Sequence, residues 1–218
     1  MDMGVVGNAG VWKNDLFPTE LIPEILELVI ASWETFKKPD RLECEVPISK
    51  AFREKIRADK NLRDDLPFHI WRELPTANTR PEDDGLIDIC FAFTGNPNEE
   101  IYFAFECKRL RIPYPPPGRF ATNNSDYVSE QGMMCFINGK YSRSVTNGGM
   151  IAYVMDGKIE EAILSIGKLI KKKASMLKLA KNTGLELSSV LGNLKNIRES
   201  RHILSTKKFT IHHIFLAV

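Results

Sequence analysis

Apolar side chains recur along this chain with two different periods, and the period separates predicted helices from predicted strands. Residues 19–36 carry apolar side chains three and four positions apart, as an amphipathic helix requires, and Thr19 can cap its start. A second helix is predicted over residues 45–60, with Pro47 tolerated in its first turn. Helical spacing with more basic and polar residues predicts further helices over residues 126–138, 159–181 and 187–200.

Short apolar runs bounded by turn-forming residues predict the strands. They lie over residues 67–75, 85–93, 101–108, 149–155 and 209–218. The second and third runs are joined by a turn and predict a hairpin, whereas the proline-rich residues 113–118 are predicted to be a loop. This order of helices and strands predicts an α/β domain with a central mixed β-sheet flanked by helices.

The predicted hairpin carries three charged residues inside runs that otherwise suit a sheet core, namely Asp88, Glu106 and Lys108. Charged groups in a half-buried sheet are costly unless something pairs with them. Because side chains alternate across a strand, all three lie on the faces opposite the bulky apolar side chains. A turn centred on Pro97 places Asp88 directly across from Glu106, with Cβ atoms roughly 4.5–5.5 Å apart.

Two carboxylates at that separation repel each other unless a cation or a proton lies between them. Magnesium prefers oxygen ligands and accepts one or two protein carboxylates, with water completing its shell. Lys108 shares a face with Glu106 and can neutralise developing charge or orient a water molecule, so the site suits metal-assisted hydrolysis of a phosphodiester. The alternative is a surface ion pair between Glu106 and Lys108, with Asp88 at the solvated end of its strand.

Asp88, followed in the next strand by Glu106-Cys107-Lys108, resembles the motif of the PD-(D/E)xK nuclease superfamily, although Ile87 stands where the superfamily's name has proline. The predicted order of elements over about residues 40–155 is similar to the αβββαβ core of its restriction-endonuclease-like fold. The resemblance implies cleavage of nucleic acid, usually DNA, that depends on Mg²⁺ or Mn²⁺. It also implies that Asp88 and Glu106 bind the metal and that Lys108 stabilises charge or positions the attacking water.

Two further positions are candidates by the same resemblance. Members of the superfamily often add an acid from the helix before the sheet, and here Glu45 is the first candidate metal ligand and Glu43 the second; either acid also suits a helix start, where it interacts favourably with the dipole. In the predicted helix 126–138, Tyr127 and Gln131 lie four apart on one face. Gln131 is a candidate to touch substrate or metal-bound water, or is simply solvated, whereas Tyr127 is expected in the core.

Positive charge is local rather than global, because the formal net charge is only +2. One cluster brackets the second hairpin strand and the following helix: Lys108, Arg109, Arg111, Arg119, Lys140 and Arg143. A second follows one face of a predicted helix: Lys168, Lys171, Lys172, Lys173, Lys178 and Lys181. Such clusters bind phosphates without reading sequence, although a run of lysines on a helix is also a common solvated face.

The 218 residues, 43% apolar and 27% charged, suit a single domain. Within it, residues 1–40 form an N-terminal extension and helix, 41–156 the catalytic core, and 157–218 the C-terminal helices and last strand. No apolar run is long enough for a membrane helix, and the start does not read as a secretory signal, so a cytoplasmic location is expected. The four cysteines are widely spaced and do not suggest a zinc site.

These features predict a Mg²⁺-dependent phosphodiesterase of the endonuclease type, acting on nucleic acid with DNA favoured. A homodimer or a partner protein is expected, because cutting two strands needs two sites. The alternative is a nucleic-acid- or protein-binding module on a nuclease-like fold that does not cut. A third interpretation is a hydrolase of another phosphate ester, which a deep closed pocket would favour.

Overall fold

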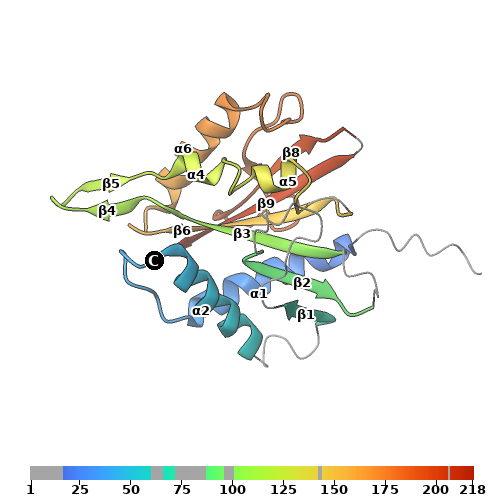
Figure 1. Ribbon diagram of the computed structural model, residues 1–218, viewed down its shortest axis with the longest axis horizontal. Helices are drawn as coiled ribbons and strands as arrows, with labels where there is room; N and C mark the ends of the chain where they lie inside the picture. The colour runs from blue at the N-terminus through green and yellow to red at the C-terminus, as the bar shows by residue number, and fades with distance from the viewer. Residues whose placement is uncertain (1–16, 60–65, 72–86, 96–100, 142–143, 206) are drawn as a thin grey trace, which may run out of the picture.

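A computed structural model describes residues 17–59, 66–71, 87–95, 101–141, 144–205 and 207–218 of the chain. These residues build a large mixed sheet with the strand order β1-β2-β3-β6-β9-β8-β7, shown in Figure 1. The three middle strands, β3, β6 and β9, run parallel, whereas the pairs on either side of them are antiparallel. The strand bounds are Phe68–Trp71 (β1), Ile89–Phe93 (β2), Tyr102–Leu110 (β3), Asn147–Val154 (β6), Glu186–Leu187 (β7), Ile197–Ile203 (β8) and Lys208–Ala217 (β9).

Helices cover both faces of the sheet, so the predicted α/β architecture with a central mixed sheet is confirmed (Figure 1). One face is covered by α1 (Ile22–Thr35), which follows the 3₁₀ turn η1 (Thr19–Leu21), and by α2 (Glu45–Ala58). The other face is covered by α4 (Asn124–Tyr127), α5 (Met134–Ile137) and α6 (Ile159–Lys172). In the described part of the chain, no helix is long and apolar enough to cross a membrane.

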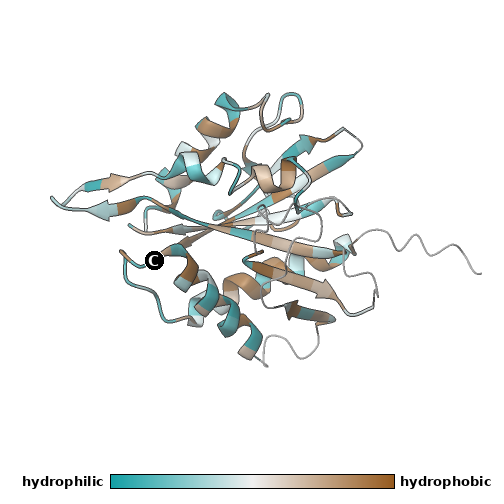
Figure 2. Cartoon of the chain, viewed as in Figure 1, coloured by the Kyte–Doolittle hydropathy of each residue, from teal (hydrophilic) through white to brown (hydrophobic). Residues whose placement is uncertain are grey.

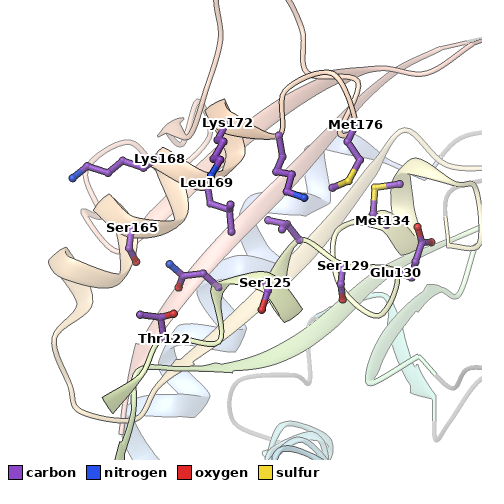
Figure 3. A pocket seen from close by; sticks show the side chains of 13 residues that line it. Thr122, Ser125, Ser129, Glu130, Met134, Ser165, Lys168, Leu169, Lys172 and Met176 are labelled. Atoms are coloured by element: carbon purple, nitrogen blue, oxygen red, sulfur yellow. The ribbon is translucent and has the colours of Figure 1, made fainter. Parts of the chain in front are cut away.

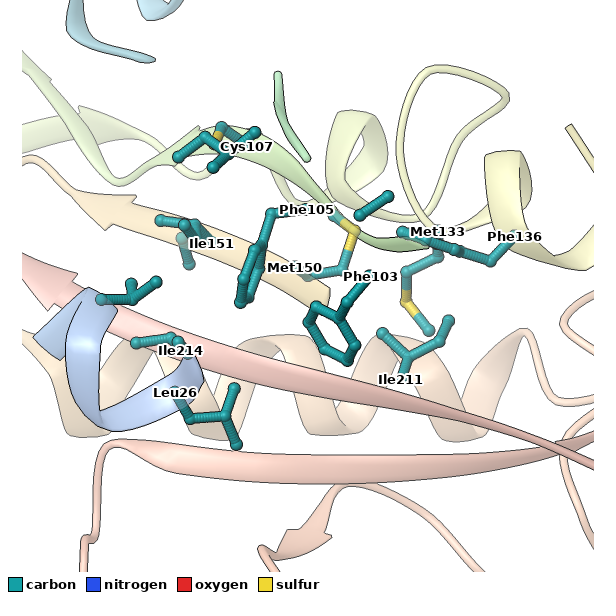
Figure 4. Close-up of a cluster of buried hydrophobic side chains, with 14 of the residues drawn as sticks. Leu26, Phe103, Phe105, Cys107, Met133, Phe136, Met150, Ile151, Ile211 and Ile214 are labelled. Atoms are coloured by element: carbon teal, nitrogen blue, oxygen red, sulfur yellow. The ribbon is translucent and has the colours of Figure 1, made fainter. Parts of the chain in front are cut away.

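The core lies on both sides of the middle strands, which are buried along almost their whole length. Figure 2 shows apolar residues concentrated in these strands and on the inner sides of the helices. In Figure 4, Leu26 of α1 lies in the same cluster as Phe105 of β3 and Ile214 of β9, and all three are fully buried. The Trp33 indole N–H donates to the carbonyl of Ala217 at 3.0 Å, which attaches α1 to β9.

The prediction of one continuous helix over 126–138 is wrong. The structure has two short helices there, α4 and α5, with turns between them. A Cβ atom at Gly132 would lie 2.3 Å from the carbonyl oxygen of Tyr127. The chain therefore folds back on α4 at a point that only glycine fits, and a continuous helix does not form. Thr19 also makes no capping hydrogen bond, since it belongs to η1 before α1 begins.

Three more predictions need correction. Helix α6 ends at Lys172 rather than at residue 181, and the turns that follow include Lys178 with a positive φ of 49°. The polar segment 187–200 is not a helix: it contains the end of β7, turns, and the start of β8. Residues 113–118 are not all loop, because β4 (Ile112–Tyr114) pairs with β5 (Arg119–Ala121) in a separate two-stranded hairpin, where proline is tolerated.

Candidate active site

The hairpin that carries the charged residues has the register predicted from its turn. Strands β2 and β3 are antiparallel, with Ile89 opposite Phe105. The register predicted from the turn is therefore confirmed for β2 and β3. Asp88 immediately precedes β2, and it lies close enough to Glu106 for its charge to raise the pKa of that acid.

Beyond the start of β2, the edge of β3 is completed by side chains instead of by a neighbouring strand. The backbone N–H of Cys107 donates to Asp88 Oδ2 at 2.8 Å, and the N–H of Arg109 donates to Glu45 Oε2 at 2.9 Å. Residues two apart on a strand direct their N–H groups to the same edge. The carboxylates of Asp88 and Glu45, from two different elements, are thus fixed along one edge of β3.

Lys108 lies at the centre of this arrangement and its ammonium group is fully engaged. Lys108 Nζ donates to Glu45 Oε1 at 2.8 Å, to Glu106 Oε1 at 2.7 Å and to the carbonyl oxygen of Cys107 at 2.8 Å. Burial alone lowers the pKa of Lys108, but the carboxylates of Glu106 and Glu45 outweigh it and raise that pKa above its usual value. Lys108 is therefore held as a buried cation in one orientation.

The two opposed acids also have raised pKa values, but for them burial is the main cause and it favours the neutral form. Burial raises the pKa of Asp88 to about 6, against the Cys107 N–H and Lys108, which both lower it. Burial raises the pKa of Glu106 to about 7, and repulsion from Asp88 adds to the rise while Lys108 opposes it. Near neutral pH this pair takes up a proton readily, as expected of close carboxylates without a second cation.

The Glu106 Oε2 atom shows whether the residues of the site fit a magnesium ion. Glu106 Oε2 is buried and accepts no hydrogen bond in the described part of the chain, so it is available as an oxygen ligand beside Asp88. Within the same residues, no three His, Cys, Asp or Glu side chains cluster closely enough to hold a metal by themselves. The donor set fits Mg²⁺ bound by one or two carboxylates with water in its other positions.

Glu45 is brought to the site, as the sequence predicts, but in a different role. Both of its carboxylate oxygens already accept hydrogen bonds, one from Lys108 and one from the N–H of Arg109. This arrangement suits a positioning residue better than a metal ligand. Glu43, the second candidate, is exposed, and its side chain accepts the N–H of the next residue, Cys44, at 3.0 Å.

Gln131 is exposed in the turn between α4 and α5, where its N–H donates to the Ser129 hydroxyl at 3.3 Å. No hydrogen bond in the described ranges joins its side chain to the acids or to Lys108. Its contact with substrate or metal-bound water therefore stays a prediction. Tyr127 is fully buried, so its predicted place in the core is confirmed.

Two residues at the site were missed from the sequence. Arg53 of α2 is buried, and its Nη1 donates to the backbone carbonyl of Asp88 at 2.9 Å. Tyr141 is buried beside Glu106, and its pKa is raised by burial and then by the Glu106 carboxylate. Arg53 could have been predicted from the sequence, since a charged residue on the apolar face of α2, next to Phe52, indicates a buried partner. Tyr141 could not have been predicted, because it follows α5 in a turn without a regular pattern.

The predicted basic cluster around the site is partly neutralised. Arg111 is buried in ion pairs with Asp156 at 2.8 Å and Glu161 at 2.6 Å, so it is not free to bind phosphate. Arg109 donates from Nη1 to the carbonyl of Glu43 at 2.7 Å. Arg143 lies outside the described residues. The cluster therefore contributes Lys108 to the site itself, and Lys140 lies beside it, with Nζ 5.7 Å from the centroid of the Tyr141 ring.

The site combines two buried carboxylates, those of Asp88 and Glu106, with a protonated lysine that is hydrogen-bonded to Glu106 and Glu45. Comparisons with protein-family models, curated proteins and solved structures found no match to the chain. The function is therefore inferred from the site's own geometry.

Proposed function

We propose that this protein is a metal-dependent nuclease that hydrolyses phosphodiester bonds of nucleic acid, most naturally DNA. We base this on one observation: the Asp88 carboxylate, fixed by the Cys107 N–H, lies near Glu106, and the Lys108 ammonium is hydrogen-bonded to Glu106 and to Glu45. The order α2, β1, β2, β3, α4–α5, β6, with β6 parallel to β3, supports a restriction-endonuclease-like core once the separate hairpin β4–β5, which stands between β3 and α4, is set aside. Without that hairpin it is the order of helices and strands that the resemblance implies.

Asp88 and Glu106 would hold a magnesium or manganese ion, with Glu106 Oε2 as the free buried oxygen. A bound ion of this kind neutralises charge on the phosphate and lowers the pKa of a bound water. The residues of the chain do the positioning. The Cys107 N–H and Arg53 fix the side chain and backbone of Asp88, and Glu45 and Glu106 orient Lys108.

Lys108 supplies positive charge where negative charge develops on the phosphate. Its raised pKa keeps it protonated throughout the neutral range, so in this role it stabilises charge and does not act as a base. To contact a phosphate, its ammonium group must give up one of its three present acceptors.

A second candidate function is a nucleic-acid-binding module that does not cut. It is favoured by the saturation of Lys108, whose three donors all have protein acceptors in this structure. In that case the acids and the lysine form a closed ion-pair network that stabilises the end of the hairpin. The two candidates differ in whether a divalent cation changes the chemistry of the protein.

Incubation with plasmid, linear DNA and RNA, in Mg²⁺, Mn²⁺ or EDTA, tests the proposal. We expect cutting that needs the metal and that is lost in Asp88→Asn, Glu106→Gln and Lys108→Met. Glu24→Gln, the same acid-to-amide change on the exposed side of α1, is the matched control and should cut like the wild type. Absence of cutting under every condition, or equal cutting by all variants, would sink the proposal.

A further inference from the structure

A groove of about 650 Å³ lies between α4, α6 and the turn after α6, and Figure 3 shows side chains from both sides pointing toward it. It includes none of the residues proposed to be catalytic. Its volume is in the range of small-ligand pockets. The groove is therefore a separate feature, whose lining has to be explained by something other than the proposed reaction.

One wall of the groove is strongly positive. Lys168, Lys172 and Lys173 line it from α6 and its end, and no carboxylate in the described ranges forms an ion pair with any of them. The single acid in the lining is Glu130, whose Oε2 already accepts a hydrogen bond from Asn138 at 2.6 Å. Three unpaired cations against one occupied carboxylate favour an anionic ligand.

The rest of the lining is uncharged and of two kinds. Hydroxyl and amide groups come mainly from the α4 side, and apolar side chains form the remainder: Thr122, Asn124, Ser125, Ser129 and Ser165 in the first kind, Val128, Met134, Leu169 and Met176 in the second. Cations with hydroxyl donors suit a phosphate and a sugar, and an apolar surface suits the face of a base. Together they match one nucleotide.

The two walls are tied together by a chain of buried hydrogen bonds. The Tyr127 hydroxyl, at the end of α4, meets His213 Nδ1 at 2.9 Å, and His213 Nε2 meets the Ser200 hydroxyl at 2.8 Å. Ser200 meets His202 Nε2 at 2.8 Å, and His202 Nδ1 meets the carbonyl of Leu177 at 2.7 Å. Leu177 follows Met176, which lines the opposite wall, so both walls are anchored to the same buried polar network.

The direction of every bond in this chain is fixed by its last member. A carbonyl only accepts, so His202 Nδ1 donates to Leu177 and the neutral ring then accepts at Nε2 from Ser200. Ser200 therefore accepts from His213 Nε2, and His213 Nδ1 accepts from Tyr127. All four side chains are fully buried and satisfied with both rings neutral. Such a satisfied network holds the groove in one shape.

The groove also adjoins the proposed active site through a single segment. Ser129, Glu130 and Met134 line the groove, and the residues just beyond them, Cys135 and Tyr141, lie close enough to Glu106 for its carboxylate to raise their pKa values, after burial. Both sites are thus on the side of the sheet covered by α4 and α5. The segment from Ser129 to Tyr141 therefore links the groove to the acids.

We propose that the groove binds one unpaired nucleotide of a nucleic-acid strand, with the phosphate at Lys172 and Lys173 and the base against Leu169, Met134 and Met176. This deepens the proposed function, on which it rests, by assigning a single-stranded segment as the ligand beside the cleavage site. A paired base in a duplex does not fit a groove of this size, because its partner strand stays attached.

The test is binding of a fluorescent single-stranded oligonucleotide in EDTA, where no cutting can occur. Lys172→Gln/Lys173→Gln is compared with Lys171→Gln/Lys181→Gln, which removes the same charge from exposed lysines outside the groove lining. We expect affinity to fall about tenfold or more, with a shallower salt dependence, in the groove variant only. The wild type should bind the single strand more tightly than the matching duplex.

Equal losses in the two double variants, preference for duplex, or no binding of the single strand would each overturn the proposal. Displacement of the oligonucleotide by micromolar nucleoside monophosphate would also overturn it, because the ligand would then be a free nucleotide. Metal-dependent cutting of plasmid by the wild type is scored separately. If the groove variant binds normally while the wild type still cuts, only the groove proposal fails. If the wild type does not cut while the groove still binds the single strand, only the nuclease proposal fails.

Discussion

Asp88 and Glu45 come from different elements, yet their carboxylates accept the N–H groups of Cys107 and Arg109, two residues apart on one edge of β3. Each acid thus takes the place that a neighbouring strand would occupy. The same two interactions satisfy the backbone and fix the acids beside Lys108. Stability of the strand edge and geometry of the site depend on the same atoms.

Removing the Glu45 carboxylate should cost stability without removing the proposed metal site. Glu45→Ala leaves the Arg109 N–H and one donor of Lys108 without their acceptor, which we expect to lower the free energy of unfolding by about 1–3 kcal/mol in urea denaturation. Binding of Mn²⁺ should weaken only slightly, whereas Asp88→Asn should weaken it severely. If Glu45→Ala weakens Mn²⁺ binding as much as Asp88→Asn does, then Glu45 is a ligand and not a positioning residue.

Divalent cations should stabilise the folded protein. A ligand that binds only the folded state adds about 2.7 kcal/mol at a hundredfold excess over its Kd, which corresponds to roughly 5–10 °C in Tm for a chain of this length. Thermal unfolding with and without Mn²⁺ measures this. Asp88→Asn and Glu106→Gln should abolish the shift, and Glu24→Gln should keep it. A shift retained in the first two variants would place the ion elsewhere.

Glu106 should make the metal-free protein less stable as the pH rises. Its pKa of about 7 in the folded state is above the ordinary glutamate value of 4.5, so the folded state holds the proton more tightly. The resulting stabilisation is complete below about pH 4.5 and is lost as the pH rises through about 7. Glu106→Gln should therefore be more stable than the wild type at pH 8, by about 1–3 kcal/mol, with little difference at pH 5.

This pH dependence is read as the difference between variant and wild type in EDTA, because other groups titrate in the same range. Glu24→Gln serves as the control and should show no such trend. A Glu106→Gln variant that is equally destabilised at both pH values would contradict the expected pKa of Glu106.

The series of buried hydrogen bonds from Tyr127 through His213, Ser200 and His202 to Leu177 should stabilise the folded protein most strongly above pH 6.5. Burial lowers the pKa of His202 to about 4 and that of His213 well below its usual value. Stability from these neutral rings is present above the unfolded pKa of about 6.5 and is lost as the pH falls toward about 4. NMR should show the proton of His202 on Nδ1 and that of His213 on Nε2 at neutral pH; reversed tautomers would disprove the assigned bond directions.

Tyr127→Phe tests the same network by removing one donor. His213 Nδ1 is then buried without a partner, which we expect to cost about 1–3 kcal/mol in the free energy of unfolding. The matched change Tyr114→Phe, at an exposed tyrosine of β4, should change stability little. Equal effects of the two changes would show that the Tyr127 hydroxyl contributes nothing.

The sequence predicted β8 poorly because three of its four buried positions are polar. Glu199, Ser200 and His202 are all fully buried in this strand, so neither the apolar alternation of a half-buried strand nor a helical stripe appears. Their partners are Ser189, Arg201 and His213, of which Ser189 and His213 become neighbours only when the sheet has formed. Local pattern cannot predict a buried polar strand whose compensation comes from elsewhere in the fold.

By itself, the sequence determined the hairpin and the opposition of Asp88 and Glu106, because turn position and the two-residue alternation of a strand are local properties of the backbone. Only the tertiary structure decided that Glu45 and Arg53, distant in sequence, contact Lys108 and Asp88, and that α4 and α6 enclose a groove. Those contacts depend on how helices pack against the sheet. Packing is set by the whole core, so no single segment encodes it.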